Sequence, residues 1–501
     1  MCSHSWPGCK NAFASAGAAT CLSALLVAVL WTCIQPAAAE EKNAPVFRAG
    51  AFAIDITPLE LPVIVNGGMT EAVADKINDR LHARCLVLDD GSIQIAIVVV
   101  DSCGVPRTLL DQAKEIASQA TGIPTERMLI SATHAHSCPS VWGGLGSDVD
   151  VKYARFLPGQ IAKGIAQAQK NLAPAKIGWA IGRDETNVAC RHWIMQPGVA
   201  PTNRFGGTKD DTVMMHPGHN NPKAIRATGQ PDPAVPVVSL QTLDGRPLAL
   251  LSAYSLHYVG APALSADYFA VFCEKMRDKI GADKAAAGER PPFMAALANA
   301  TSGDTWLMDY TQKEKRKYSI EQVAEDVSSA AFAALQKIEY QPWAPIVMEQ
   351  KLLTLGVRMP SAEEVSAARE FVKTFEGRKP KTVEEVYARE TLLLNDLPPT
   401  RELKLQAIRI GDLAIATIPN EVYGSTGLAI KKDSPIKTTF VVELANGCEG
   451  YLLPPDLLKL GGYTAWRARS ACLEPEAEPK IRAALLELLH SVARQRAAEK
   501  P

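Results

Sequence analysis

The stretch Ser131-Ala132-Thr133-His134-Ala135-His136-Ser137 includes the end of an apolar run, Met128-Leu129-Ile130, that is typical of a buried strand. Side chains at positions i and i+2 of a strand face the same way, so His134 and His136 are expected to point together beyond the strand end. Two neighbouring imidazoles suit a divalent metal such as zinc. A pair of hydrogen-bonded structural histidines is the alternative that this short motif leaves open.

The strand that carries the two histidines is predicted to belong to a βαβ unit. The apolar run Ile93–Val100 ends in Asp101, and a helix over 107–121, stopped by Gly122, separates it from the histidine strand. The expected buried stripe of this helix consists of Leu109, Leu110, Ala113, Ile116, Ala117 and Ala120. Parallel strands of such a unit end at one edge of the sheet, where α/β proteins place their ligand sites. Asp101 is expected there, either orienting a ligand imidazole or capping a loop.

The rest of the chain alternates strand-like and helical patterns. Residues 47–340 are predicted to form a mixed α/β body, and 361–397 a helical hairpin inserted between strands. Between 196 and 234 Pro, Gly and Asn dominate, as in long loops that line a site. Further strands are expected at 235–240, 248–256, 293–298, 405–410, 413–418 and 438–444, and further helices at 153–171, 268–281, 319–338 and 479–494. The predicted fold class is α/β of mixed α+β character: one large domain of mixed sheets flanked by helices.

The first 39 residues are predicted to be a secretory signal peptide. The apolar stretch Leu22–Leu30 precedes Ala37-Ala38-Ala39, a small-residue cleavage site before Glu40. The mature chain would then cover 40–501 and be periplasmic or secreted, with an uncleaved anchor as the alternative. The net charge of −1 and the lack of a long basic run give no reason to expect a nucleic-acid partner.

The seven cysteines outside the leader contain no Cys-x-x-Cys pair, so a structural zinc knuckle is not expected. An exported protein could form one or two disulfides, whose pairing the sequence does not define.

A zinc site needs a third and usually a fourth ligand. His257 closes the apolar run 248–256 and is the strongest candidate. Glu421 follows the run 413–418, where it is expected either as a ligand or as a neighbour of a helix start. Asp304 follows Gly303 in what resembles a tight turn.

Seven further segments accompany the histidine motif, which stands between the first and the second of them. In chain order they are Ala53-Ile54-Asp55-Ile56-Thr57-Pro58, Ser255-Leu256-His257, Ser265-Ala266-Asp267-Tyr268, Ser302-Gly303-Asp304, Pro419-Asn420-Glu421, Asn446-Gly447-Cys448-Glu449-Gly450-Tyr451 and Gly461-Gly462-Tyr463. Their order and spacing resemble the neutral/alkaline, non-lysosomal ceramidase family, specifically its catalytic domain, over most of 47–470. The resemblance implies one catalytic zinc (Zn) held by His134, His257, Glu421 and Tyr451. It places His136 beside the metal or the substrate, and Tyr463 and Arg191 in the pocket.

The chain departs from the ceramidase pattern at two places. A serine of the ceramidase active site closely follows the Gly-Asn or Gly-Asp turn, whereas Trp306, preceded by Thr305, stands at that position here. An indole cannot supply the hydroxyl, and its bulk would fill space near the scissile bond. The immunoglobulin-like domain that follows the catalytic domain of full-length ceramidases is not expected either, because the chain ends soon after Tyr463.

These features together predict an exported zinc-dependent hydrolase that cleaves the amide of an N-acyl small molecule other than long-chain ceramide. The predicted catalytic residues are His136, Tyr463, Arg191 and Asp304, with Tyr463 or His136 stabilising the oxyanion and His136 or Asp304 moving the proton to the leaving amine. The substrate could be a lipid, and the protein could touch a membrane surface without spanning it. The alternatives are a metal-retaining binding protein without activity and an esterase.

Overall fold

The computed structural model describes residues 46–282 and 291–495, so the predicted signal peptide lies outside the described residues. The centre of the fold is an eight-stranded mixed sheet in the order β14-β13-β12-β7-β1-β4-β5-β6. Its strands are β1 (Arg48–Asp55), β4 (His82–Asp89), β5 (Gln94–Val100), β6 (Met128–Ala132), β7 (Ala173–Arg183), β12 (Ala234–Thr242), β13 (Pro247–Tyr254) and β14 (Met294–Asn299). The pairs β5–β6 and β13–β14 are parallel, and the other pairs are antiparallel.

A second sheet of four strands packs face to face on the first. It runs in the order β16-β17-β18-β20, and its strands are β16 (Ile346–Gly356), β17 (Thr400–Ile410), β18 (Leu413–Thr417) and β20 (Thr438–Val442). Apolar side chains of both sheets, such as Ile97 and Val238 of the first and Ile415 and Phe440 of the second, share one buried cluster. Interdigitated inner faces of this kind form the core of packed sheets.

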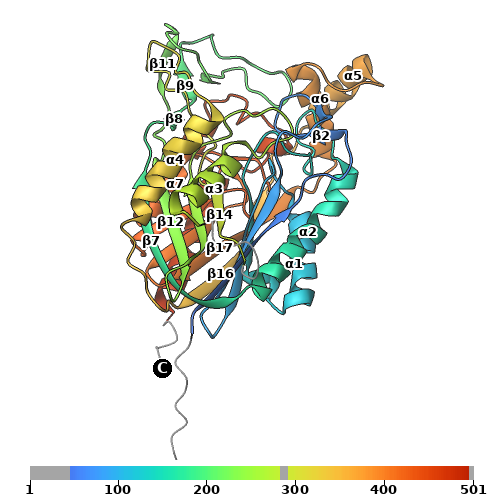
Figure 1. The fold of residues 1–501 in the computed structure, drawn as a ribbon. Helices are drawn as coiled ribbons and strands as arrows, with labels where there is room; N and C mark the ends of the chain where they lie inside the picture. Colours follow the sequence, from blue (N-terminus) through green and yellow to red (C-terminus); the bar gives the residue numbers. More distant parts are fainter. Residues whose placement is uncertain (1–45, 283–290, 496–501) are drawn as a thin grey trace, which may run out of the picture. The chain divides into compact units, whose positions relative to one another are not determined.

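Helices cover the outer faces of both sheets. Figure 1 shows α1 and α2 beside the blue strands of the first sheet, and α3 and α4 beside its green strands. The first sheet is covered by α1 (Arg107–Thr121), α2 (Val151–Lys170), α3 (Asp267–Ile280) and α4 (Ile320–Leu335), and the second by α7 (Gly424–Asp433) and α9 (Ala477–Arg494). The layers are therefore helix, sheet, sheet, helix. This arrangement confirms the predicted fold class of mixed sheets flanked by helices.

Three parallel βαβ units bring strand ends together. They are β5-α1-β6 and β13-α3-β14 at the two ends of the first sheet, and β18-α7-β20 in the second. The end strands β6 and β14 of the large sheet also approach each other. Ligand sites of parallel sheets lie beyond the carboxyl ends of the strands. The segments that follow β6, β13 and β18 are therefore the expected location of a ligand site.

The predicted helix over 107–121 has the bounds of α1, and Gly122 ends it with a left-handed φ of 74°. Its buried face differs from the predicted stripe. Ile116 is 39% exposed, while Lys114 is fully buried. The helix therefore lies rotated from the orientation that its apolar residues alone favour, and the buried Lys114 donates a hydrogen bond to the side-chain amide oxygen of Asn446 at 2.6 Å.

The predicted helical hairpin consists of α5 (Ala362–Val372) and α6 (Val383–Asn395), which pack against each other. A capping box between Ser361 and Glu364 begins α5. In Figure 1 the hairpin lies at the same end of the molecule as β8, β9 and β11. The loop 196–234 contains two short strands that pair with β9, which the turn-rich sequence did not reveal.

The small strands are β2 (Val63–Val65), β3 (Ala72–Ala74), β8 (Ala189–Cys190), β9 (His192–Met195), β10 (Val213–Met215), β11 (Ala224–Ala227), β15 (Thr305–Trp306), β19 (Glu421–Val422) and β21 (Tyr451–Leu452), and the remaining helical segments are α8 (Pro455–Leu458), η1 (Thr125–Arg127), η2 (Lys373–Phe375) and η3 (Arg469–Ala471).

All seven cysteines in the described part of the chain are free thiols, so the disulfides considered from sequence do not form there. Within residues 46–282 and 291–495, no helix has the length and apolar character that a membrane crossing requires.

Candidate metal centre

The three βαβ units place two histidines and a glutamate in contact. His134 follows β6, His257 follows β13, and Glu421 follows β18. The Nε2 atoms of His134 and His257 are 3.0 Å apart, and His134 Nε2 is 3.2 Å from Glu421 Oε2. All three side chains are at least 95% buried. One ligand atom from each lies within 4.8 Å of the others, a spacing that could hold a metal ion.

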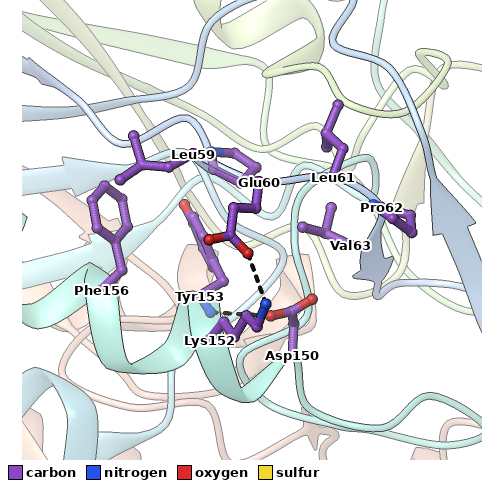
Figure 2. Close-up of a pocket in the computed structure, with 10 residues that line it drawn as sticks. Leu59, Glu60, Leu61, Pro62, Val63, Asp150, Lys152, Tyr153 and Phe156 are labelled. Carbon is purple, nitrogen blue, oxygen red and sulfur yellow. Dashed lines mark hydrogen bonds and ion pairs between the residues drawn. The ribbon is translucent and has the colours of Figure 1, made fainter.

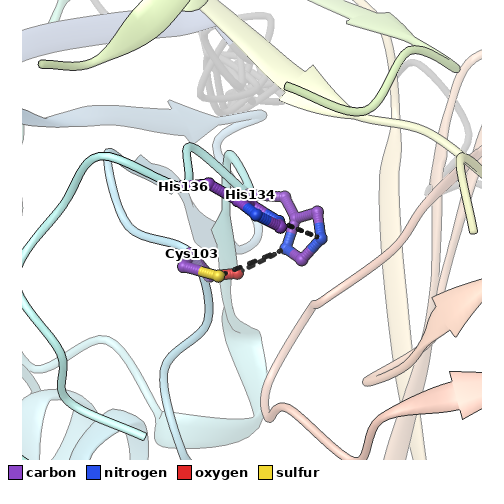
Figure 3. Close-up of side chains that lie close together, drawn as sticks. All are labelled: Cys103, His134 and His136. Atoms are coloured by element: carbon purple, nitrogen blue, oxygen red, sulfur yellow. Dashed lines mark hydrogen bonds between the residues drawn. The ribbon is translucent and has the colours of Figure 1, made fainter. Parts of the chain in front are cut away.

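His134 and His136 meet for a different reason from the one the sequence suggested. Both residues lie beyond the end of β6, and His134 has a left-handed φ of 67°. The strand alternation of side chains therefore does not apply to them, but the turn still brings their Nε2 atoms to 3.0 Å (Figure 3). A left-handed conformation costs energy in a residue with a Cβ atom, and such strain is concentrated at functional sites.

The hydrogen bonds of the Nδ1 atoms of His134 and His257 show which ring nitrogens are available to bind a cation. His134 Nδ1 is 2.6 Å from the Cys103 carbonyl oxygen, which only accepts, so Nδ1 carries the proton (Figure 3). His257 Nδ1 faces the Ser302 carbonyl at 3.3 Å. In neutral imidazoles this leaves both Nε2 lone pairs directed at each other and at the Glu421 carboxylate. A donor near these acceptors is Arg191 Nη2, 3.3 Å from His257 Nε2. A proton or a cation between the three atoms would remove the remaining repulsion, and imidazole and carboxylate are ligands that bind zinc.

The pKa shifts agree with a cation at this place. Burial disfavours a charged imidazole, but Glu421 and then Cys103 outweigh it and raise the pKa of His134 well above its ordinary value. Burial, the charge of Arg191 and His134 lower the pKa of His257 well below its ordinary value. Without a metal, a proton on His134 therefore takes the position between the ligands. A bound metal would replace that proton.

Tyr451 completes the predicted ligand set. It lies on β21, where it is the direct partner of Glu421 in the parallel pair β19–β21. Its phenol hydrogen-bonds to the Glu421 carboxylate, and burial together with that carboxylate raises the pKa of Tyr451 well above its ordinary value. The structure thus brings all four predicted ligands together; their binding of zinc stays a prediction.

The predicted pocket residues His136, Arg191 and Tyr463 line the same cavity as the four ligands. Burial and the charges of His134 and Arg191 lower the pKa of His136 well below its ordinary value, so its imidazole is neutral. Its ring stacks on Tyr258 with 3.8 Å between centroids. Gly67 lies against the other side, where a Cβ atom would stand 2.4 Å from the His136 ring, and its φ of 114° also requires glycine.

Asp304 is not where the proton-transfer prediction needs it. Its Oδ1 accepts the backbone N–H of Gly424 at 2.7 Å, at the first turn of α7, and the carboxylate does not line the cavity. Its carbonyl oxygen accepts the backbone N–H of Arg191 at 2.8 Å. Asp304 is therefore a buried positioning residue that connects α7 to the Arg191 segment. A carboxylate held in this way cannot reach a leaving amine in the cavity.

Asp101 also differs from both roles that the sequence left open. It is fully buried and forms an ion pair with Arg84 at 2.6 Å, while its other oxygen accepts the backbone N–H of His82 at 2.8 Å. Neither contact involves a ligand imidazole. The carboxylate satisfies a buried arginine within the first sheet, as buried charges generally require.

A buried carboxylate that sequence reasoning missed lies behind His257. Glu443 follows β20, and its Oε1 accepts the Ser302 hydroxyl at 2.6 Å and the Asn299 amide at 2.9 Å. Ser302 Oγ is in turn 3.4 Å from His257 Nδ1. Burial raises the pKa of Glu443 to about 8. A carboxylate at the end of an apolar strand, the same signal that identified Asp101, could have identified it.

Trp306 and Thr305 make different contacts near the site. The Thr305 hydroxyl donates to the Ser255 carbonyl at 2.6 Å, away from the metal ligands. The indole of Trp306 lies 4.9 Å from the Tyr258 ring and 6.3 Å from the His257 ring, measured between centroids. The position that the ceramidase resemblance assigns to a serine thus carries an indole that packs against Tyr258, a residue of the cavity lining, but does not line the cavity itself.

The cavity at the ligands has a volume of about 160 Å³. Pockets for drug-sized ligands usually span about 300–1,000 Å³, so this cavity fits a small group or one end of a longer molecule. A larger cavity of about 260 Å³, bordered by Leu59, Phe156 and the ion pair of Lys152 with Glu60 (Figure 2), contains no histidine or cysteine. Of these two cavities, only the smaller one is lined by histidines and a cysteine.

Comparison with solved structures identifies the fold. A neutral ceramidase from Pseudomonas aeruginosa superposes with a TM-score of 0.65 at 14% sequence identity, covering 91% of this chain and 76% of that one. The chain has the neutral ceramidase fold. A second structure, a ceramidase complexed with C2, gives a TM-score of 0.64 at 14% identity and covers 91% and 77% of the two chains. No protein-family model and no curated protein sequence matches the chain.

Proposed function

We propose that the protein is an exported, zinc-dependent amide hydrolase acting on a small N-acyl compound. The observation that carries the proposal is the contact between His134 Nε2, His257 Nε2 and Glu421 Oε2, three buried atoms of the types that bind zinc. The neutral ceramidase fold supports an amidohydrolase-type reaction at this place. The predicted ligand set is His134, His257, Glu421 and Tyr451.

Zinc bound there would lower the pKa of a water molecule toward ~7 and so supply a nucleophile at neutral pH. The protein's own groups do the rest. His136 is neutral and beside the ligands, so its imidazole can take a proton and deliver it to the leaving amine. Tyr463, whose ring lies 5.9 Å from that of Tyr451, can donate a hydrogen bond from its hydroxyl to the developing oxyanion.

The size of the cavity supports a small acyl or amine group rather than long-chain ceramide. Its volume is about 160 Å³, and Trp306 packs against Tyr258, which lines the cavity, so a smaller residue at 306 would leave room for Tyr258 to move. An aromatic side chain of this size buries about 150–250 Å². Export is proposed on the sequence alone, from the apolar stretch that ends at Ala37-Ala38-Ala39.

The proposal is tested by metal analysis and a substrate panel on the purified protein. We expect one zinc per chain and hydrolysis of at least one class of short N-acyl compound, both lost after chelation and restored by zinc. Zinc content without turnover of any amide would favour a metal-retaining binding protein. Faster turnover of the matched esters than of all amides would favour an esterase.

A further inference from the structure

Two arginines in the described chain are more than nine-tenths buried, and only one of them has a carboxylate partner. Arg84 is 5% exposed and forms an ion pair with Asp101 at 2.6 Å. Arg191 is 3% exposed, and none of the described carboxylates forms an ion pair with it. A buried charge without a partner costs several kcal/mol, so such charges are normally paired. Arg191 is the exception, and it lines the cavity of the proposed zinc site.

The contacts of Arg191 leave donors free. Nη2 donates to the Gly303 carbonyl at 2.9 Å, which fixes the side chain. Nη1 is 3.5 Å from His216 Nε2, at the limit of a hydrogen bond, and Nε has no partner although it is buried. A guanidinium has five N–H donors in a planar fork that matches a carboxylate.

Metal binding would release one more donor. Arg191 Nη2 is 3.3 Å from His257 Nε2, which is the atom proposed to bind zinc. That lone pair cannot accept a hydrogen bond and bind a cation together. The loaded site therefore contains Arg191 and a divalent cation against the carboxylate of Glu421 and the phenol of Tyr451. Even with that phenol ionised, one positive charge is left over, and an anionic ligand would compensate it.

His216 and Trp306, which flank the guanidinium, add no negative charge. Burial and the charge of Arg191 lower the pKa of His216 to about 3, so that imidazole is neutral at pH 7. The centroid of the Trp306 ring lies 5.9 Å from the guanidinium carbon. An aromatic face attracts a cation but leaves the donors at its edge free for a ligand.

We infer that the substrate carries a carboxylate that Arg191 binds, and that the substrate class is the N-acyl amino acids. The guanidinium stands beside His257, so an anion bound to it lies only a few bonds from an amide carbonyl at the metal. An α-carboxylate, attached to the carbon next to the amide nitrogen, satisfies that spacing. This inference rests on the proposed amide hydrolysis and specifies its substrate.

The test compares matched substrates on the zinc-loaded protein. Each N-acetyl or N-octanoyl amino acid is paired with the N-acyl amine that lacks only the carboxylate. We expect kcat/KM to favour the carboxylate member by about 100-fold or more, because a buried polar group rejects a ligand that leaves it unpaired. Arg191→Gln should reduce this preference to a few-fold, mainly through KM. Arg316→Gln, which removes a partly buried arginine outside the cavity, is the matched control and should keep it.

Binding supplies a readout that does not depend on turnover. Calorimetry with N-acetylalanine should show binding to metal-free wild type and to Arg316→Gln but not to Arg191→Gln, with thermal unfolding confirming that each variant is folded. Equal cleavage of neutral and carboxylate substrates by wild type would overturn the inference and leave amide hydrolysis standing. A loss of kcat for both members alike in Arg191→Gln would also overturn it, since the arginine would then serve the oxyanion. If no amide is cleaved, the proposed function fails, and binding decides the inference alone: lack of binding to wild type overturns it.

Discussion

Replacing Lys114 by methionine should stabilise the protein at pH 6, and the gain should shrink as the pH rises. Lys114 is fully buried on α1, and burial, followed by the charge of Lys404, lowers its pKa from 10.5 to about 7. Below pH 7 the ammonium is charged in the folded and unfolded chains alike, so the folded chain bears the full cost of burying it. The difference of about 3.5 pH units corresponds to roughly 5 kcal/mol at about 1.36 kcal/mol per unit.

The expected gain is smaller than this cost, because Lys114→Met also loses the hydrogen bond to Asn446 Oδ1. A bond to a charged group contributes roughly 1.5–3 kcal/mol. The backbone N–H of Ile130, 3.4 Å from the same oxygen, still donates to it. We therefore expect the free energy of unfolding to rise by roughly 2–3 kcal/mol at pH 6 in the variant, from the difference between these two contributions.

The pH dependence gives the sharper test. Between the folded pKa of about 7 and the unfolded value of 10.5, the unfolded chain binds the proton that the folded chain has released. Wild-type stability therefore rises with pH in this window by about 1.36 kcal/mol per unit relative to the variant. From pH 7 to pH 9 the advantage of Lys114→Met should fall by roughly 2–3 kcal/mol.

Urea unfolding at pH 6, 7, 8 and 9, with zinc present throughout, measures these differences. Lys163→Met, on the exposed side of α2, is the matched control and should show no such change with pH. A difference between wild type and Lys114→Met that is constant from pH 6 to pH 9 would refute the reasoning, as would a variant less stable than wild type at pH 6. Asn446 precedes Tyr451 in the same loop, so a folded variant that loses zinc would show that Lys114 also positions this ligand.

Three further predictions concern the site and the leader. His134→Ala or His257→Ala should abolish zinc retention measured by mass spectrometry, whereas His136→Ala should keep the metal and lose activity; the opposite pattern for His134 and His136 would reverse their roles. Trp306→Ser should raise turnover of long-chain N-acyl substrates in a graded acyl series, and no change would place the block in the loop over 196–234. Amino-terminal sequencing of exported protein should begin near Glu40, and soluble cytoplasmic protein that retains its first residue would contradict export.

Several features of this protein follow from the sequence by itself. The continuous apolar run that becomes β5 and the bounds of α1 are set by local patterns, because burial on both faces of a strand and a glycine after a helix leave signals within a few residues. The βαβ rule then places His134 at a sheet edge, and the motif order matches the ceramidase fold that the superposition shows. These conclusions depend on short segments, because the residues that define each strand or helix end lie within the segment itself.

Only the tertiary structure decided which distant residues meet. The contact of His134 with Glu421 joins two different sheets, and the packing angle between sheets leaves no local pattern in the sequence. Asp304 faces the start of α7 rather than the cavity, and Arg191 lies in the cavity without a carboxylate partner. The buried amine of Lys114 has its partner, Asn446, in a loop more than 300 residues away in the chain. Sequence patterns report which face of an element is apolar, but the partner of a polar group depends on how whole elements pack.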